Sequence, residues 1–189
     1  MTSISRTKIG AILIGLLFLF QNLSFAQEAK LTNIIVTNTR DDLLLYLNVE
    51  GAFRETMKDA ILSGVPTTFS FFIVLYRNRN FWIDNKIADI TITQTIKYNN
   101  IKKEYSVKRS WENGEAKFTQ SFREAQKLMT EIDSLKVLPL SKLEKGQQYQ
   151  IRAKAELSKL TLPFYLHYVL FFVSLWDFET DWYTIDFIY

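Results

Sequence analysis

The sequence predicts an α+β fold that is mainly β: an antiparallel, β-sandwich-like meander with two amphipathic helices. Three observations support this fold class. Several stretches alternate apolar and polar residues, as antiparallel strands with one buried face do. Two other stretches carry apolar residues at helical spacing. Strands and helices do not alternate regularly along the chain, which disfavours a doubly wound parallel sheet.

Residues 1–26 have the pattern of a cleavable signal peptide. Two cations precede the uncharged apolar run Ile9–Phe20, and small residues precede a cut after Ala26. The alternative is an uncleaved anchor, but a spanning helix needs about 20 apolar residues and this run is shorter. We therefore expect an exported protein, periplasmic or peripheral at the cell envelope, with a single β-rich domain over residues 27–189.

Charge and cysteine content exclude several classes of function. The formal net charge of +3 includes two cations of the predicted signal, so residues 27–189 carry only +1 and a nucleic-acid partner gains no support. The chain has no cysteine, which excludes disulfides, thiolate metal sites and cysteine nucleophiles.

The first half of the predicted domain opens with a hairpin and a helix. Leu31–Asn38 and Leu43–Glu50 are strand-like runs around a polar "TRDD" turn. A helix of about three turns is expected within residues 52–66, where Gly64 provides its end signal. Thr67–Tyr76 is β-branched and aromatic and predicts a buried strand. The apolar residues of the helix are Phe53, Met57, Ala60 and Ile61.

The second half predicts more strands and the second helix. Ile87–Tyr98 and Glu104–Trp111 alternate, and Ala116–Phe122 returns as a partner strand after an "ENGE" turn. Phe122–Leu135 has one apolar helical stripe. Gln147–Leu160 alternates most clearly, with Tyr149, Ile151, Ala153, Ala155 and Leu157 facing inward. The helical stripe consists of Phe122, Ala125, Leu128, Met129, Ile132 and Leu135.

Three segments resemble a known bacterial exported family over nearly the whole of the predicted domain. They are "GAFRETMKDAILSGVPTTFSFFIVLYR", "IKYNNIKKEYSVKR" and "LPFYLHYVLFFVSLWDFETDWYTIDF", and the family is called domain of unknown function 4390. The resemblance implies an envelope protein of one domain in Gram-negative-type bacteria. It implies no activity, because the family has none assigned. Its most specific part is "WDFETDW", whose candidate functional or structural signature is Trp176, Asp177, Phe178, Thr180, Asp181 and Trp182.

The sequence lacks a recognisable catalytic constellation. His167 is the only histidine, it lies among aromatic residues, and no GxSxG turn accompanies it. We favour a hydrogen-bonded core residue over a catalytic base. A zinc site needs three or four His or Cys ligands, and phosphate-binding glycine loops are absent from the sequence. We therefore expect no catalytic residues, no metal and no cofactor.

The acidic residues of "DFETD" allow two other interpretations. Asp177, Glu179 and Asp181 would share one face of an extended strand, where they could bind calcium or act as paired acid and base on a glycoside. The glycine of the calcium loop is missing, and no second acidic cluster lies nearby in sequence. We favour a solvated strand face with Trp182 packed behind it.

Five cations in "KYNNIKKEYSVKR" suggest a second candidate site. Interleaved with tyrosines, they could bind anionic lipid, polysaccharide or nucleic acid. Lysine also protects exposed strand edges from unwanted pairing. We favour edge protection and ordinary solvation for Lys97, Lys102, Lys103, Lys108 and Arg109.

The uncharged stretch Leu160–Trp176 approaches the length of a membrane span. Residues 177–189 carry four acids and no Lys or Arg, whereas a cytoplasmic flank favours cations. An outer-membrane barrel does not fit two amphipathic helices. We favour aromatic closure of the core, which leaves open a groove for a ligand.

These observations favour a non-enzymatic envelope protein that binds a protein partner. The alternative is a carrier of a lipid or apolar ligand in an aromatic C-terminal groove, and a second alternative is a hydrolase. We expect no nucleic-acid partner and no transmembrane helix in the mature chain.

Overall fold

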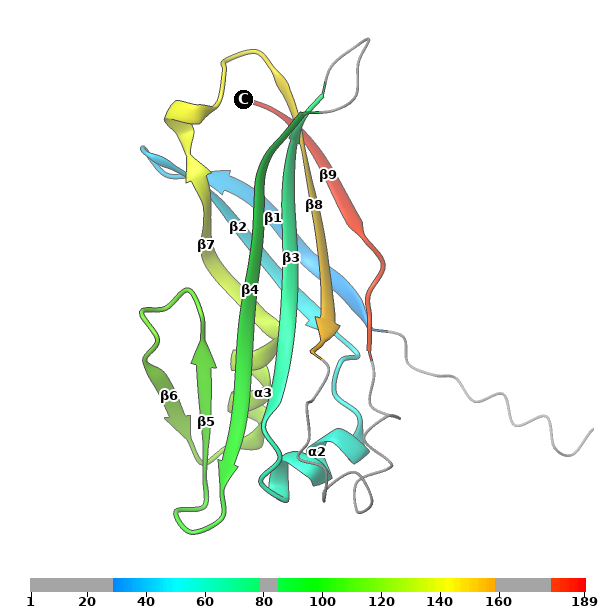
Figure 1. Ribbon diagram of the computed structural model, residues 1–189, viewed down its shortest axis with the longest axis vertical. Coiled ribbons are helices and arrows are strands. Elements are labelled where there is room, and N and C mark those ends of the chain that lie inside the picture. The colour runs from blue at the N-terminus through cyan, green and yellow to red at the C-terminus, as the bar shows by residue number, and fades with distance from the viewer. Residues whose placement is uncertain (1–28, 79–84, 159–177) are drawn as a thin grey trace, which may run out of the picture.

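The computed structural model describes residues 29–78, 85–158 and 178–189, which form two antiparallel sheets (Figure 1). One sheet has the strand order β1-β2-β7, and the other has the order β6-β5-β4-β3-β8-β9. This confirms the predicted fold class. The strands are β1 (Lys30–Asn38), β2 (Asp42–Glu50), β3 (Thr67–Arg77), β4 (Asn85–Asn99), β5 (Glu104–Arg109), β6 (Ala116–Thr119), β7 (Glu131–Pro139), β8 (Gln148–Leu157) and β9 (Tyr183–Ile188).

Three shorter elements complete the described fold: helices α2 (Glu55–Leu62) and α3 (Phe122–Thr130) and the 3₁₀ helix η1 (Leu140–Lys142). None of the helices in the described part of the chain is long and apolar enough to cross a membrane. Several sequence predictions fall outside the described residues. They are the signal peptide (1–26), the uncharged stretch (160–176), His167, Trp176 and Asp177.

The chain path follows the predicted meander. β1 and β2 form the opening hairpin, with Lys30 opposite Glu50 and Asn38 opposite Leu43. β3 to β6 then pair consecutively. β7 crosses to pair with β2, β8 returns to pair with β3, and β9 lies outside β8. The chain therefore passes between the two sheets three times among the described strands: from β2 to β3, from β6 to β7 and from β7 to β8.

Both sheets contribute to one cluster of buried apolar side chains. The alternation predicted for the strand before residue 160 is confirmed in β8, where every second residue is buried. Aromatic rings fill much of the interior, and Phe69, Phe71 and Tyr149 are completely buried. β2 supplies Leu43, Leu45, Leu47 and Val49, β3 supplies Phe69, Phe71, Ile73 and Leu75, and β8 supplies Tyr149, Ile151, Ala153, Ala155 and Leu157.

Helix α2 is shorter than the predicted three turns, because the chain becomes helical only at Glu55. Phe53 precedes the helix, and its ring packs 5.2 Å from Phe69 and 5.8 Å from Phe122. The predicted stop is confirmed: Gly64 has a φ of 87°, and Val65 N donates to Ala60 O at 3.0 Å. Glycine takes this left-handed conformation without a Cβ penalty.

The predicted helix over Phe122–Leu135 is wrong in its second half. α3 ends at Thr130, and Ile132 and Leu135 are buried in β7, opposite Leu47 and Leu45 of β2. Their spacing of three suits a helix, but it also suits a bulged strand. The register shifts between Leu45 and Leu47, and Ser134 has a φ of 50°. The extra residue of a bulge turns both apolar side chains to the same face.

We predict that Phe69→Ala lowers the free energy of unfolding by about 3–5 kcal/mol, since it removes a completely buried ring and leaves a cavity. Chemical denaturation measures this loss. Phe118→Ala is the matched control, because Phe118 is exposed, and it should change stability by less than about 0.5 kcal/mol. Equal losses in the two variants would contradict the described core.

Candidate functional site: strand β9 and the hollow around Trp182

Two residues of the "WDFETDW" signature fasten the chain just before β9. Phe178 is buried, and its ring packs edge-on against Phe69 at 4.7 Å. Thr180 is also buried; its N–H donates to Ala155 O at 2.9 Å, and its hydroxyl accepts from Ala155 N at 3.0 Å. These contacts hold the start of the last segment against the end of β8.

The two described acids of "WDFETDW", Glu179 and Asp181, are exposed, as the alternation predicts. Glu179 forms an ion pair with Lys154, which also lies 3.6 Å from Glu156. The hydrogen bond from Lys154 to Glu179, supported by the two negative charges, raises the pKa of Lys154 although desolvation acts to lower it. Among the described residues, no group of three or more His, Asp or Glu is placed to hold a metal ion. Asp177 lies outside them.

The sequence predicts that Trp182 packs behind the acids, but this residue is 49% exposed. The register explains the difference. Glu179 lies opposite Glu156, whereas Tyr183 lies opposite Ala153, so the pairing slips by one residue between them. A slip of one residue exchanges the two faces of a strand. Trp182 therefore lies on the outer face, where its ring is 5.9 Å from Lys154 Nζ.

A surface hollow of about 450 Å³ lies beside Trp182 on the outer face of the six-stranded sheet. On its floor, the Arg152 guanidinium lies 4.8 Å from the centre of the Tyr76 ring, and Arg152 Nε donates to Gln150 at 2.6 Å. Gln150 in turn donates to Asp186 at 2.9 Å. The lining residues are Val74, Tyr76, Gln150, Arg152, Trp182 and Thr184.

A smaller hollow of about 190 Å³ lies between the start of β1 and the start of β9. Trp182 lines both hollows, the larger one on the outer face and the smaller one at the edge of the sandwich. Aromatic rings, an amide and a guanidinium offer apolar contact and hydrogen bonds to a bound group. The smaller hollow is lined by Ala29, Lys30, Leu31, Asp181, Trp182 and Tyr183.

β9 is an edge strand of the six-stranded sheet (Figure 1). Its register against β8 runs without a shift from Tyr183 to Ile188. Tyr189 N donates to Gln147 O at 3.2 Å. Backbone groups alternate in direction along an antiparallel pair, so those of Thr184, Asp186 and Ile188 point away from β8. β9 contains no Lys, Arg or Pro, and Ile188 is 75% exposed.

The other edge strands carry features that discourage pairing with a further strand. β6 is only four residues long and contains Lys117. β1 has a register shift between Thr32 and Ile35, and β7 has two shifts and contains Lys136. β9 is thus the edge in the described structure that is best able to accept another strand.

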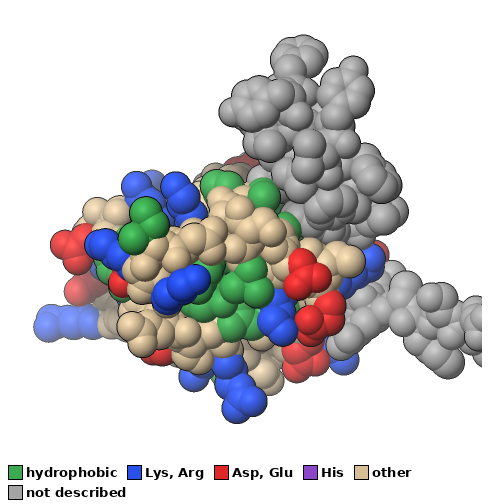
Figure 2. All heavy atoms as spheres, turned by 90° about the horizontal axis from the view of Figure 1, so that it is seen from below, with side chains coloured by type: hydrophobic (Ala, Val, Ile, Leu, Met, Phe, Trp, Pro, Cys, Tyr) green, Lys and Arg blue, Asp and Glu red, His purple; other side chains and the backbone are tan. Residues whose placement is uncertain are grey.

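Of the five cations in the second candidate site, four are exposed: Lys97, Lys102, Lys103 and Lys108. Viewed from below, the end of the molecule that carries the β4–β5 turn shows Lys and Arg side chains around hydrophobic ones (Figure 2). The expectation of solvation is wrong for Arg109, which is buried. The sequence contains a signal for this burial, because Arg109 continues the alternation in which Tyr105 and Val107 face inward.

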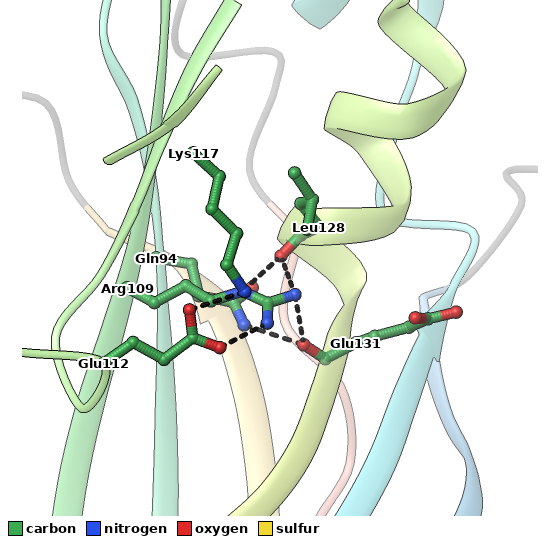
Figure 3. A network of polar contacts seen from close by, with 6 residues as sticks. All are labelled: Gln94, Arg109, Glu112, Lys117, Leu128 and Glu131. Atoms are coloured by element: carbon green, nitrogen blue, oxygen red, sulfur yellow. Dashed lines mark hydrogen bonds and ion pairs between the residues drawn. The ribbon is translucent and has the colours of Figure 1, made fainter. Parts of the chain in front are cut away.

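Arg109 binds the point where α3 becomes β7 (Figure 3). Nε and Nη2 donate to Leu128 O at 3.1 and 2.8 Å, and Nη2 also donates to Glu131 O at 3.3 Å. Gln94 Nε2 donates to the same Glu131 carbonyl at 3.0 Å. The last carbonyls of a helix lack intrahelical partners and favour positive charge. Arg109 supplies both the donors and the charge.

Glu112 completes this cluster. Its carboxylate accepts from Arg109 Nη1 at 2.8 Å and pairs with Lys117 Nζ at 2.7 Å. Partial burial acts to raise the pKa of the Glu112 carboxyl, but hydrogen bonds and positive charge from Lys117 and Arg109 outweigh it and lower this pKa. The cluster therefore has a structural role in fixing α3, β5 and β7.

We predict that Glu112→Gln removes part of the acid sensitivity of the fold. A lowered folded-state pKa stabilises the protein above the unfolded value of about 4.5, and this contribution is lost as pH falls through the folded value. When pH is lowered from 7, the free energy of unfolding should fall less below about pH 4.5 in the variant than in the wild type. Glu115→Gln, an exposed control, should keep the wild-type slope. Identical slopes for all three proteins would refute the role of Glu112.

Comparison with known proteins gives one match. The chain matches the family described as Domain of unknown function (DUF4390) over residues 26–186. No curated protein and no solved structure matches it. The matched range includes every described strand except the last two residues of β9, together with the fastening residues, Trp182 and the Arg109 cluster. The chain belongs to the DUF4390 family.

Proposed function

We propose that the protein is a non-enzymatic, exported domain of the cell envelope that binds a protein partner by accepting an extended segment beside β9. The single observation that carries the proposal is the regular edge of β9, which pairs only with β8 among the described strands, in a fold whose other described edges are short or bulged. Export is supported by the pattern of residues 1–26.

Strand addition provides affinity through backbone hydrogen bonds and specificity through alternate side-chain pockets. The outward backbone groups of Thr184, Asp186 and Ile188 supply the hydrogen bonds. The two hollows beside Trp182 supply the pockets, one on the outer face and one at the edge of the sandwich. Aromatic residues such as Trp182 are common anchors in protein interfaces.

The segment before β9 makes the site rigid. Phe178 and Thr180 hold it through a buried ring contact and paired hydrogen bonds to Ala155. Rigid binding sites lose less conformational entropy when a partner binds. The signature residues thus have two roles in this proposal: Phe178 and Thr180 fasten the edge, and Trp182 contacts the partner.

A second candidate function is a carrier of a lipid or apolar ligand. The half-exposed Trp182 and its adjacent hollow favour it. The space between the two sheets offers less support, because Phe69, Phe71 and Tyr149 fill it. Native mass spectrometry of the purified protein separates the two functions, since a carrier retains lipid and a strand-accepting domain does not.

We predict that a photo-crosslinking residue at Ile188 captures a discrete partner in intact cells. Thr184→Pro should abolish the product, because it removes an outward N–H while leaving the bonds to β8 in place. Because the crosslinking residue replaces Ile188, a charged residue is introduced at another position of β9. Asp186→Lys places a lysine on the edge and should lower the yield of the crosslinked product. Ile35→Lys is the matched control on β1, where Ile35 is 56% exposed.

Thermal unfolding of each variant verifies that the fold is intact. Recovery of only uncrosslinked protein would contradict the proposal. A product that survives Thr184→Pro would also contradict it, because the partner would then bind without pairing to β9.

A further inference from the structure

The turn between β4 and β5 presents an aliphatic side chain at its apex. Ile101 is 94% exposed. The Asn99 side chain fixes the turn, since its Oδ1 accepts from Ile101 N at 3.0 Å and from Lys102 N at 3.1 Å. Lys103 closes the turn with a φ of 54°. The exposed apolar apex is therefore held by the fold.

A second apolar side chain lies beside this turn. Phe118 of β6 is 64% exposed and lines a surface hollow of about 490 Å³ together with Ile101, Tyr98 and Lys97. The sheet register explains the proximity, because Phe118 lies opposite Ser106 and Ser106 lies opposite Lys97. The apex and the β6 face thus form one apolar surface.

Cations surround this apolar surface. Lys97, Lys102, Lys103 and Lys108 are all exposed, and Glu104 is the acid in the hollow's lining. Lys102 lies 3.7 Å from Glu104. Lys97, Lys103 and Lys108 form no ion pair with another described residue. Three lysines without an ion-pair partner in the described structure therefore lie around two exposed apolar side chains.

We propose that this surface docks on an anionic phospholipid bilayer. Ile101 and Phe118 enter the boundary between headgroups and acyl chains, and the lysines contact lipid phosphates. Interfacial binding of proteins combines buried apolar area with attraction of cations to anionic lipid. Single-stranded nucleic acid is the other polyanion to consider, but its sites rely on aromatic stacking platforms. An aliphatic apex suits a bilayer better.

The bilayer surface and β9 lie in different parts of the sheet. Tyr183 is level with Ala153, Ile73 and Ile90, whereas the apex lies beyond Asn99 at the end of β4. In Figure 1 the β4–β5 turn is at the bottom and β9 is at the upper right. Membrane docking is therefore independent of the proposed strand addition, and Asp186→Lys should leave it unchanged.

We predict that the purified protein co-sediments with vesicles of phosphatidylcholine plus phosphatidylglycerol and not with phosphatidylcholine alone. Binding should fall as salt rises, because the Debye length is about 10 Å at 0.1 M ionic strength. Ile101→Ser should weaken binding, and the combined change of Lys97, Lys102 and Lys103 to Gln should weaken it by roughly tenfold or more. Residues 1–26 are the same in every variant, so a comparison of variants removes any contribution of this segment to vesicle binding.

Matched controls use exposed residues elsewhere. Ile35→Ser and Lys145→Gln, the latter between η1 and β8, should leave binding unchanged. The cysteine-free chain also allows one environment-sensitive label at Ile101→Cys or at Lys145→Cys. Vesicles should shift the emission of the first label only. Three results would each overturn the proposal. They are equal binding to neutral vesicles, unchanged binding of the Ile101 and lysine variants, and binding to single-stranded RNA without binding to vesicles.

Discussion

The buried guanidinium of Arg109 fixes the position at which helix α3 becomes strand β7. It satisfies the Leu128 and Glu131 carbonyls where the helical bonding pattern ends. β7 then begins at Glu131 and pairs with β2, so that Ile132 and Leu135 enter the core. Without this contact, the apolar spacing of that segment suits a longer helix, and the three-stranded sheet would lose an edge strand.

The strands and the first helix stop could be predicted from the sequence, because alternation and a left-handed glycine are local signals. They are seen in β8 and at Gly64. Three features could not, because each depends on contacts distant in sequence. The bulge in β7 imitates helical spacing, the carbonyls that bind the inward-facing Arg109 are brought there by the end of α3, and a one-residue slip after Glu179 places Trp182 on the outer face.

The candidate site follows from the same constraints. A chain without cysteine depends on its core, and aromatic rings such as Phe69 and Phe178 supply buried area and bind the final segment to it. That anchoring leaves β9 with a regular register at the edge. The slip before it exposes Trp182 beside the edge. Stability and the proposed partner binding thus use neighbouring residues of one signature, whose buried members hold the exposed one in place.

The central claim is that β9 is an open edge that a partner strand completes. Residue-resolved amide hydrogen exchange tests it most directly, on the protein alone and on the complex recovered by crosslinking. The account predicts fast exchange at Thr184, Asp186 and Ile188 in the protein alone and slow exchange in the complex, with Ile185 and Phe187 protected in both. Protection of the first three amides in the protein alone, or no gain in the complex, would contradict it.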